Sequence, residues 1–432
     1  MNMLAEELNE VLRETVAGRL LSGLGQRLYF PKGIIAQSAE ARKNAHFANA
    51  TIGMAYQNGR PIIMSAVADE IPSLTPEEIV VYAPTAGVER TRLIWKDILA
   101  QKNPSIDPQG ISLPVVVPGI TAGISYIADL FIDEATPVLS SRPCWDNYEL
   151  IFGERRGAPV TEIPFFGSGP GLDLDGIRQN FRSEARSGQV RAILNFPNNP
   201  SGYSPTHAEA DTLIEIVEEI AESGADVLVI CDDAYFGLFY DADFIQESLF
   251  GRLSTIHERV LAVKIDGPTK EDYAWGFRMG FVTFGSKNLQ SVHYDALVKK
   301  LMGAIRSSVS CANTPAQTLM LKTMDDPRTP AEKERYYNLL KSRYHAVKHF
   351  IESRPPLDCL QALPFNSGYF MTFRCVDIDA EKLRLELLHK HGIGVVAFGT
   401  EFLRIAFSSI DESQIESVYR IVYDTARSMG NS

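Results

Sequence analysis

Residues 225–235 read ADVLVICDDAY, an almost uninterrupted apolar run that ends in two aspartates, an alanine and a tyrosine. A short apolar run of this kind predicts a strand that is covered on both faces, because a half-exposed strand would alternate apolar and polar residues. The polar residues after the run then lie at the carboxyl end of the strand. The stretch therefore predicts a buried sheet with polar side chains at one edge.

Similar apolar runs occur on both sides of this strand and alternate with helical patterns. Helices are expected at 121–131 and 206–223, where apolar residues recur on one side. This alternation predicts an α/β fold with a mostly parallel sheet and helices on both of its faces. The expected strands are 113–117, 137–140, 190–195, 226–231, 260–265 and 280–284.

Several residues suited to chemistry or binding fall just after these expected strands. They are Gly119, Trp145, Asn199, Asp232 and Lys270. In open α/β sheets, ligands bind outside the carboxyl ends of the strands. We therefore expect these five residues to face one shared site.

The pattern changes after about residue 326. A charged helical stretch (330–353) is followed by an apolar segment (368–374), a helix (380–391) and a second apolar segment (403–407). This order predicts a smaller α+β domain, completed by the first fifty or so residues. The expected division is an N-terminal arm with part of the small domain in 1–60, a large domain in 61–325 and a small C-terminal domain in 326–432.

Charge and cysteine content exclude several classes of protein. The 432 residues include 42 Lys and Arg against 54 Asp and Glu, a net charge of −12, which disfavours a nucleic-acid-binding protein. No apolar run is long enough to span a bilayer, and residues 1–19 predict an amphipathic helix rather than a signal peptide. The five scattered cysteines predict reduced thiols in a cytoplasmic protein, without a disulfide framework or metal site.

Three short motifs occur in a fixed order. They are NNPSG at 198–202, DDAY at 232–235, and Lys270 followed eight residues later by Arg278. Each motif is weak alone, but together they resemble the class I and II aminotransferases of the aspartate and aromatic kind, which are fold-type I pyridoxal-phosphate enzymes. The resemblance covers about residues 51–407. It implies a seven-stranded-type sheet in the large domain, pyridoxal 5′-phosphate as cofactor and an amino-group transfer reaction.

The resemblance implies a role for each residue around the cofactor ring. Lys270 would form an aldimine with the cofactor and then move the substrate α-proton as a base. Asp232 would pair with the pyridine nitrogen and keep it protonated; Asp233 is the rival candidate. Tyr235 and Asn199 would hydrogen-bond the ring oxygen. Taken alone, Lys270 beside two acids would be read as a surface lysine.

The same resemblance implies how the rest of the cofactor is held. Trp145 would stack on the ring. The phosphate would lie against Gly119, Ile120, Thr121 and Arg278, since a helix N-terminus and a guanidinium both favour an anion. Tyr82 would reach the phosphate of a neighbouring subunit, which implies a homodimer with shared sites. The family often has a phosphate-binding serine where this chain has Gly267.

Substrate-binding residues are also implied. Arg404 would bind the α-carboxylate of the substrate in a bidentate pair, with Asn199 beside it. Gly53 and Met54 align with the segment that closes over the substrate. Arg306 aligns with the arginine that, in dicarboxylate-specific members, reaches from the partner subunit to the side-chain carboxylate of the substrate. The residues after Arg306 depart from that pattern.

The resulting hypothesis is a homodimeric aminotransferase that exchanges an amino group between an L-amino acid and a 2-oxo acid, with dicarboxylic or aromatic substrates as candidates. A lyase, racemase or decarboxylase on the same fold is an alternative, because these enzymes share Lys270 and Asp232. A catalytically silent regulatory or binding protein is an alternative of another class. The motifs do not name the amino acid, since specificity depends on pocket shape.

Overall fold

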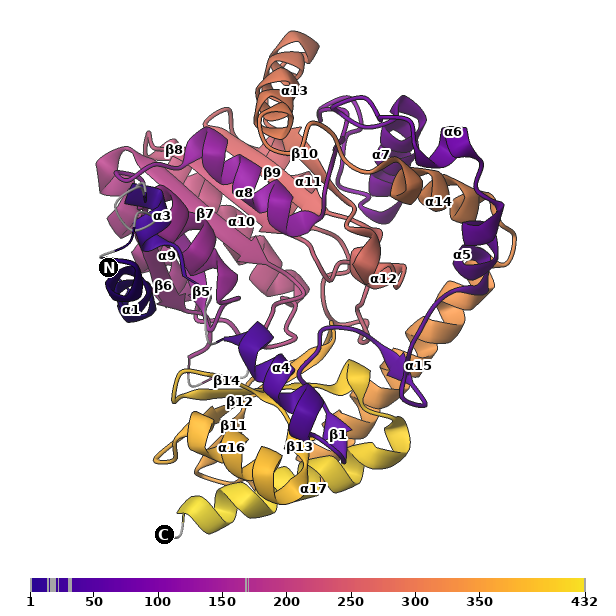
Figure 1. Ribbon diagram of the computed structural model, residues 1–432. Coiled ribbons are helices and arrows are strands. Elements are labelled where there is room, and N and C mark those ends of the chain that lie inside the picture. Colours follow the sequence, from indigo (N-terminus) through magenta and orange to yellow (C-terminus); the bar gives the residue numbers. More distant parts are fainter. Residues whose placement is uncertain are drawn as a thin grey trace.

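The computed structural model describes residues 2–13, 15, 21, 23–29, 33–167, 169 and 171–430. Figure 1 shows a larger part built around a twisted sheet and a smaller part below it that contains the C-terminus. The long helix α15 (Thr329–Glu352) runs from the larger part to the smaller one. The architecture agrees with the predicted α/β class.

The central sheet has seven strands in the order β4-β10-β9-β8-β7-β5-β6. All neighbouring strands from β9 to β6 run parallel, whereas β10 is antiparallel to both of its neighbours. The prediction of a mostly parallel sheet is confirmed. The strands are β4 (Val115–Val117), β5 (Val138–Arg142), β6 (Val160–Pro164), β7 (Gln189–Asn195), β8 (Asp226–Asp232), β9 (Val260–Asp266) and β10 (Gly280–Gly285).

Strand β6 is absent from the sequence-based expectation. It lies at the edge of the sheet, and of its five residues only Ile163 is buried. An edge strand covered on one side lacks the continuous apolar run by which the central strands were recognised. The periodicity that predicts buried strands therefore could not detect this one.

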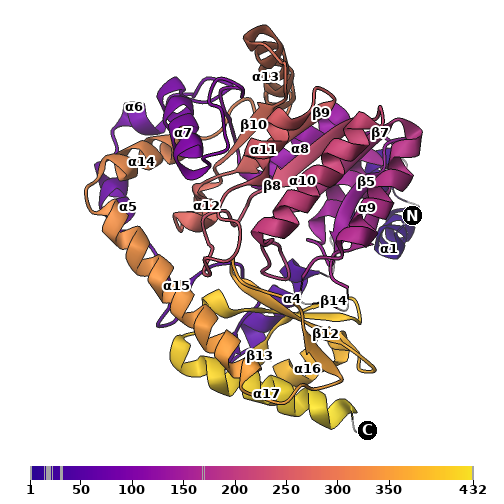
Figure 2. The ribbon, with the colours of Figure 1, turned by 180° about the vertical axis from the view of Figure 1, so that it is seen from behind.

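Helices cover both faces of the sheet. Helix α8 (Ile120–Phe131) lies in front of it in Figure 1, whereas the view from behind in Figure 2 shows the helices of the other face. Those helices are α9 (Leu174–Glu184), α10 (His207–Glu222) and α11 (Leu249–Ile256). A capping box fixes the start of α10, because Thr206 and Glu209 each accept a hydrogen bond from the other's backbone N–H.

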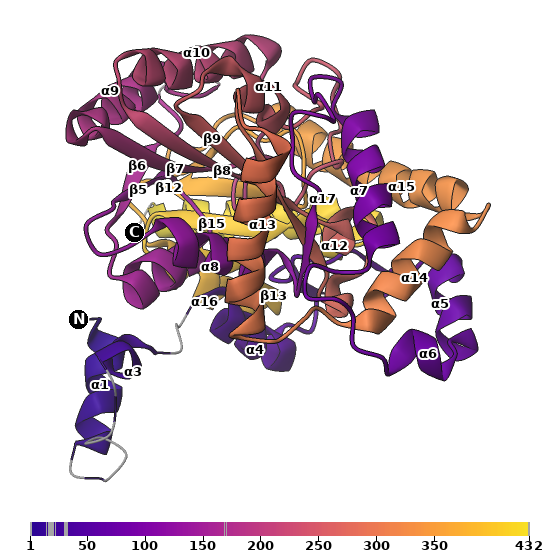
Figure 3. The same cartoon turned by 90° about the horizontal axis from the view of Figure 1, so that it is seen from above.

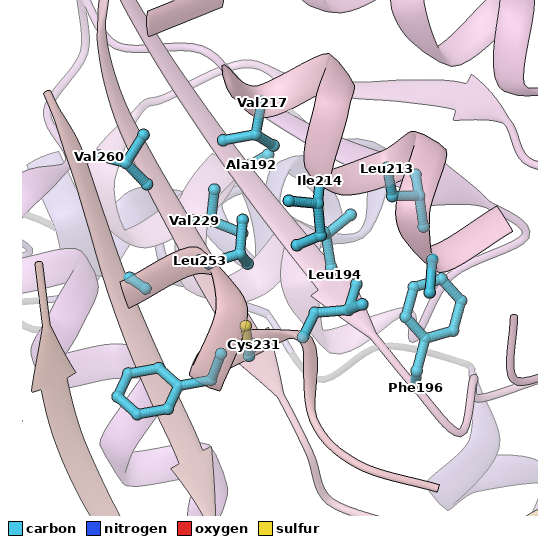
Figure 4. Close-up of a cluster of buried hydrophobic side chains, with 14 of the residues drawn as sticks. Ala192, Leu194, Phe196, Leu213, Ile214, Val217, Val229, Cys231, Leu253 and Val260 are labelled. Carbon is cyan, nitrogen blue, oxygen red and sulfur yellow. The ribbon is translucent and has the colours of Figure 1, made fainter. Parts of the chain in front are cut away.

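Apolar side chains from β7 and β8 pack against α10 and α11 on this second face. Figure 4 shows Leu194, Val229 and Cys231 of the sheet beside Ile214 and Leu253 of the helices. Residues between these on the strands, such as Ile193 and Ile230, belong instead to the core under α8. The sheet is therefore buried on both faces, as the uninterrupted apolar runs predict.

The smaller part contains a four-stranded sheet in the order β11-β12-β15-β14, with the N-terminal helix α4 packed beside it. Strand β1 near the N-terminus pairs with β13 near the C-terminus, so both ends of the chain contribute. The domain boundaries themselves stay a prediction. The elements are α4 (Ile34–Asn44), β1 (Ala48–Asn49), β11 (Leu360–Ala362), β12 (Phe370–Cys375), α16 (Ala380–His391), β13 (Ile393–Gly394), β14 (Val396–Phe398), β15 (Phe402–Ala406) and α17 (Glu412–Gly430).

The remaining elements are short or peripheral. Within the N-terminal amphipathic helix expected over 1–19, α1 covers Met3–Leu12, and residues 1, 14 and 16–20 lie outside the described part. Figure 3 shows α1 and α3 to one side of the rest. The elements are α1 (Met3–Leu12), α3 (Gly23–Arg27), β2 (Tyr56–Gln57), β3 (Arg60–Pro61), α5 (Ser65–Glu70), α6 (Pro76–Ile79), α7 (Glu89–Lys102), α12 (Pro268–Glu271), α13 (Ser291–Arg306), α14 (Thr314–Asp325), the 3-10 helices Ile71–Ser73, Ala185–Ser187, Trp275–Phe277 and Phe407–Ser409, and the π-helix Glu149–Glu154. Among the described residues, no helix has the length and apolar character needed to cross a bilayer.

Candidate active site

A pocket of about 140 Å³ opens at the carboxyl ends of β7 and β8. Its lining residues are Ile120, Thr121, Trp145, Asn195, Asn199, Asp232, Ala234, Tyr235, Thr269, Lys270 and Arg278. Apart from Gly119 and Tyr82, every residue expected to hold a cofactor lines this pocket. The place agrees with the rule that ligands bind at the carboxyl ends of parallel strands.

Asp232 is the last residue of β8 and is buried. Its carboxylate accepts a hydrogen bond of 2.5 Å from the Tyr148 hydroxyl and one of 3.3 Å from the backbone N–H of Ala234. Burial raises the pKa of Asp232 to about 6, although the hydrogen bond from Tyr148 opposes this effect. A cationic partner would lower the pKa again, so the site favours positive charge beside this carboxylate.

Asp233, the rival candidate, has its carboxylate on the other side of the sheet. It binds the ammonium group of Lys264 and accepts a hydrogen bond of 2.6 Å from the Ser248 hydroxyl. Asp233 is also missing from the pocket lining. The geometry therefore favours Asp232 as the carboxylate of the pocket.

Lys270 lies in the short helix α12, directly after β9. Its amine is 5.1 Å from the centre of the Tyr235 ring, and no residue in the described part of the chain gives it a hydrogen bond or an ion pair. Burial lowers the pKa of Lys270 to about 8, and the positive charge of Arg278 adds to this effect. An unpaired amine with a lowered pKa is suited to act as a nucleophile or a base.

The two acids after Lys270 bind other lysines. Glu271 lies 2.6 Å from the ammonium of Lys102, and Asp272 lies 2.5 Å from that of Lys333. Neither acid therefore pairs with Lys270. The alternative of an ordinary surface lysine does not match this geometry.

The opposite end of the pocket is suited to an anion. Gly119 has φ +95°, which favours glycine, and a Cβ there would lie 2.6 Å from Nη2 of Arg278. The Arg278 guanidinium therefore lies directly at the start of α8. Ile120 and Thr121 belong to the first turn of that helix, whose backbone N–H groups lack intrahelical partners and attract anions.

Gly267 lies where a phosphate-binding serine is usual, and the structure shows why a side chain does not fit. A Cβ at this position would lie 2.9 Å from the Cα of Gly280 and 2.9 Å from the carbonyl oxygen of Met279. Both obstacles are backbone atoms of β10 and the turn before it. A serine hydroxyl is thus excluded here, and the donors at this end of the pocket are those of the α8 N-terminus and Arg278.

We expect Gly267→Ser to weaken the protein rather than to improve phosphate binding. The added side chain must displace backbone, and overpacking of this kind costs about 1–3 kcal/mol of unfolding free energy. Denaturant unfolding would measure the loss. Gly276→Ser is the matched control, since nothing lies within 4 Å of a Cβ there; equal stability of the two variants would contradict the steric explanation.

Arg404 lies on β15 and is buried beside the pocket. Its Nη1 donates to the side-chain oxygen of Asn199 at 2.9 Å, and its Nη2 donates to the carbonyl of Thr51 at 2.9 Å. Its Nε is buried and has no acceptor among the described residues. Burial lowers the pKa of Arg404 to about 10. A buried cation with an unpaired donor favours binding of an anionic group.

The segment with Gly53 and Met54 passes next to these groups. A Cβ on Gly53 would lie 3.1 Å from the Tyr235 hydroxyl and 3.1 Å from the Phe370 ring, and the Met54 carbonyl accepts a hydrogen bond of 2.9 Å from Ser408. The structure therefore brings the expected substrate-closing segment to the pocket.

Tyr82 and Arg306 do not reach the pocket of their own chain. Tyr82 is 87% exposed, and Arg306 is exposed at the end of α13 with its guanidinium bound to the Ser310 hydroxyl. Both were expected to act in the site of a partner subunit. The roles of Tyr82 and Arg306 in a partner subunit therefore stay predictions.

Three residues of the site were missed from the sequence. Asn195 ends β7, donates to the carbonyl of Asp232 at 2.7 Å and accepts from the backbone N–H of Asn199 at 2.7 Å. Tyr148 holds the Asp232 carboxylate, and Thr269 lines the pocket. Asn195 could have been found, because it is a polar residue at the carboxyl end of an apolar run, as Asp232 is. Tyr148 follows Trp145 by three residues, but its spacing alone gave no signal.

Comparison with known proteins relates this geometry to a family. The model of the family "Aminotransferase class I and II" matches residues 56–422, most of the chain. The chain belongs to this family. This aminotransferase is 19% identical over 357 residues to the aspartate aminotransferase of Sulfurisphaera tokodaii, covering 79% of this chain and 81% of that protein. It is 30% identical over 129 residues to a putative cystathionine beta-lyase of Mycobacterium tuberculosis, which is 29% of this chain and 30% of that protein.

The fold of this aminotransferase also has solved counterparts. The crystal structure of an aminotransferase from Anaerococcus prevotii superposes with a TM-score of 0.82 at 22% identity, covering 92% of this chain and 98% of that one. The predicted family, its fold and an aminotransferase as the class of enzyme are confirmed.

Class I and II aminotransferases depend on pyridoxal phosphate, and the pocket fits this cofactor. At one end, the close approach of Gly119 to Arg278 leaves a cradle with N–H donors and a guanidinium for a phosphate. The unpaired amine of Lys270 matches an aldehyde, and the buried carboxylate of Asp232 matches a protonated pyridine nitrogen. The donor set thus has one group for each polar part of the cofactor.

Proposed function

We propose that this protein transfers an amino group between an L-amino acid and a 2-oxo acid, using pyridoxal 5′-phosphate held in the pocket between α8 and Tyr235. One observation carries the proposal: the unpaired amine of Lys270 shares a pocket with a buried carboxylate and lies near a buried, incompletely paired arginine. A nucleophile, an acid and an anion site together suit amino-acid chemistry.

Individual residues would hold the cofactor as follows. Arg278 and the first turn of α8 would bind the phosphate, and Trp145 would lie against the ring. Tyr235 and Asn199 would hydrogen-bond the ring oxygen, and Asp232 would hold the ring nitrogen. When bound, pyridoxal phosphate supplies an electron sink that stabilises negative charge at the substrate α-carbon.

The residues of this chain perform the remaining tasks. Arg404 fixes the substrate carboxylate and so decides which bond at the α-carbon is aligned for cleavage. Lys270 accepts the α-proton on its neutral amine and returns it to a neighbouring atom. Gly53 and Met54 close over the substrate and exclude water. The same geometry, with another bond aligned, would give the lyase, racemase or decarboxylase alternative.

The proposal includes a homodimer. Ile79, Val80, Val81 and Tyr82 are consecutive and between 42% and 87% exposed, an apolar stretch that a monomer would leave in water. A partner subunit that covers this stretch would receive the Tyr82 hydroxyl in its own phosphate site. A cytoplasmic location is also proposed; all five cysteines are free thiols, as a reducing compartment requires.

The pKa of Lys270 leads to a test of its role. Its amine is neutral above pH 8 and protonated below it, because burial lowers its pKa to about 8. The rate at which the cofactor-free protein captures pyridoxal phosphate should therefore rise with pH and level off above about pH 8. Stopped-flow absorbance would measure the profile; a rate that keeps rising to pH 10 would contradict the lowered pKa.

Arg306 provides a test of substrate class. If it binds a side-chain carboxylate in the partner's site, Arg306→Gln removes about 2–5 kcal/mol from that contact. The value of kcat/KM for aspartate and glutamate should fall far more than the value for an apolar amino acid. Lys299→Gln, an exposed cation on the same helix, is the control. Equal losses on both kinds of substrate would exclude the specificity role.

A half-reaction screen tests the function itself. The purified protein is mixed with single amino acids, and loss of the cofactor's near-ultraviolet to visible absorbance is followed. A stoichiometric yield of the matching 2-oxo acid supports amino-group transfer. A product without nitrogen exchange supports a lyase or decarboxylase instead, and a protein whose absorbance borohydride does not bleach is a catalytically silent fold.

A further inference from the structure

A fully buried lysine lies on the face of the sheet opposite the pocket. Lys264 in β9 is 0% exposed and is paired in register with Cys231 of β8. Cys231 packs in the core beneath α10 and α11, as Figure 4 shows, whereas Ile265 packs in the core beneath α8. Because side chains alternate between the two faces of a strand, Lys264 and Asp266 lie on the α11 side.

The ammonium group of Lys264 has two carboxylate partners there. It binds Asp233 and lies 3.4 Å from Asp266. Both carboxylates are buried and have further donors: the Ser248 hydroxyl donates to Asp233 at 2.6 Å, and the Trp95 indole donates to Asp266 at 3.1 Å. The result is a buried cluster of one cation and two carboxylates.

Stability alone explains this cluster poorly. Burying charged groups costs desolvation free energy. A buried ion pair can therefore often be replaced by apolar residues of the same volume without loss of stability. The position of the cluster suggests another reason. Asp233 follows Asp232 directly, and a negative charge on Asp233 raises the pKa of Asp232. A cation bound to Asp233 offsets that repulsion.

We propose that Lys264 is a positioning residue for the reaction: by binding the Asp233 carboxylate on the far face of the sheet, it leaves Asp232 as the ionised carboxylate of the pocket. The inference rests on the proposed function. It accounts for two adjacent buried aspartates at the end of one strand, of which only one lines the pocket.

The ionisable groups around both members of this arrangement are few. Asp232 has Lys270 and Tyr235 on the pocket side, Asp233 and Cys231 next to it in the chain, and the Tyr148 hydroxyl as a hydrogen-bond donor. Lys264 has Asp233, Asp266 and the Cys231 thiol. Among these groups, the ammonium of Lys264 is the positive charge that binds Asp233.

Lys264→Met in the pyridoxal-phosphate-loaded enzyme tests the proposal. Asp232 should then take up a proton and the ring nitrogen should lose its positive charge, which favours protonation of the Lys270 nitrogen. The midpoint of the cofactor's absorbance titration should move to higher pH by roughly one unit. The dissociation constant of the cofactor should rise about tenfold, measured by dialysis and absorbance.

Companion variants separate this role from a structural one. Lys264→Met combined with Asp233→Asn removes both charges and should return the midpoint and the affinity toward wild type, even if the melting temperature stays low. Asp233→Asn and Asp266→Asn alone keep the cation and should not raise the midpoint, so they serve if Lys264→Met does not fold.

Two results would overturn the proposal. One is a wild-type midpoint and affinity in Lys264→Met; the other is an upward shift in Asp233→Asn, or in the double variant, as large as in Lys264→Met. A wild-type protein without a borohydride-sensitive absorbance would instead refute the proposed function. If the wild-type protein has that absorbance and Lys264→Met titrates at the same midpoint as wild type, only the role of Lys264 is refuted.

Discussion

Lys270→Ala is expected to lower kcat for amino-group transfer by about 10⁴-fold, the upper end of what a positioned proton-transfer group contributes. The reason is geometric: no other described lysine lines the pocket, and the neighbouring acids already bind Lys102 and Lys333. The variant should also lose covalent attachment of the cofactor, which borohydride reduction followed by mass measurement of the protein would show.

The control for this variant is Lys102→Ala. Lys102 binds Glu271, directly after Lys270, but lies outside the pocket lining. Its removal should change stability slightly and leave covalent cofactor attachment intact. If Lys270→Ala kept the borohydride-fixed mass, or if Lys102→Ala lost it, the assignment of Lys270 would be wrong.

The central part of the fold could be predicted because its strands are buried on both faces. Each of β7, β8 and β9 starts within one residue of its expected position and ends one residue beyond it or at it, since an uninterrupted apolar run marks such a strand. The edge strand β6 has no such apolar run. The N-terminal helix expected over 1–19 is described as α1 up to Leu12, and the remainder of that prediction falls largely on residues 14 and 16–20, outside the described part.

The site was predictable where a residue type and its place after a strand coincide. Asp232, Asn199 and Lys270 follow apolar runs, and the structure brings them into one pocket. The contacts of Tyr148 with Asp232 and of Lys264 with Asp233 were not predictable, because they join residues 84 and 31 positions apart. The contact of Arg404 with Asn199 joins residues 205 positions apart, which no local pattern encodes.

Asp232→Asn is expected to lower kcat by roughly 10²–10³-fold, the size of the loss when one preorganised electrostatic group is removed. Asparagine keeps the shape and can still accept the hydrogen bond from Tyr148, so the fold should be retained. The amide, however, carries no negative charge to hold a proton on the ring nitrogen, and negative charge at the substrate α-carbon is then less stabilised.

Two comparisons make this prediction specific. Asp232→Glu keeps the charge and should recover part of the lost rate, whereas Tyr148→Phe removes only the hydrogen bond and should cost less than Asp232→Asn. The pre-steady-state rate of α-proton loss, measured with α-deuterated substrate, should fall with kcat in Asp232→Asn. An unchanged rate in that variant would mean that the carboxylate of the pocket does not act on the ring nitrogen, because a group that stabilises the transition state must slow the step when it is removed.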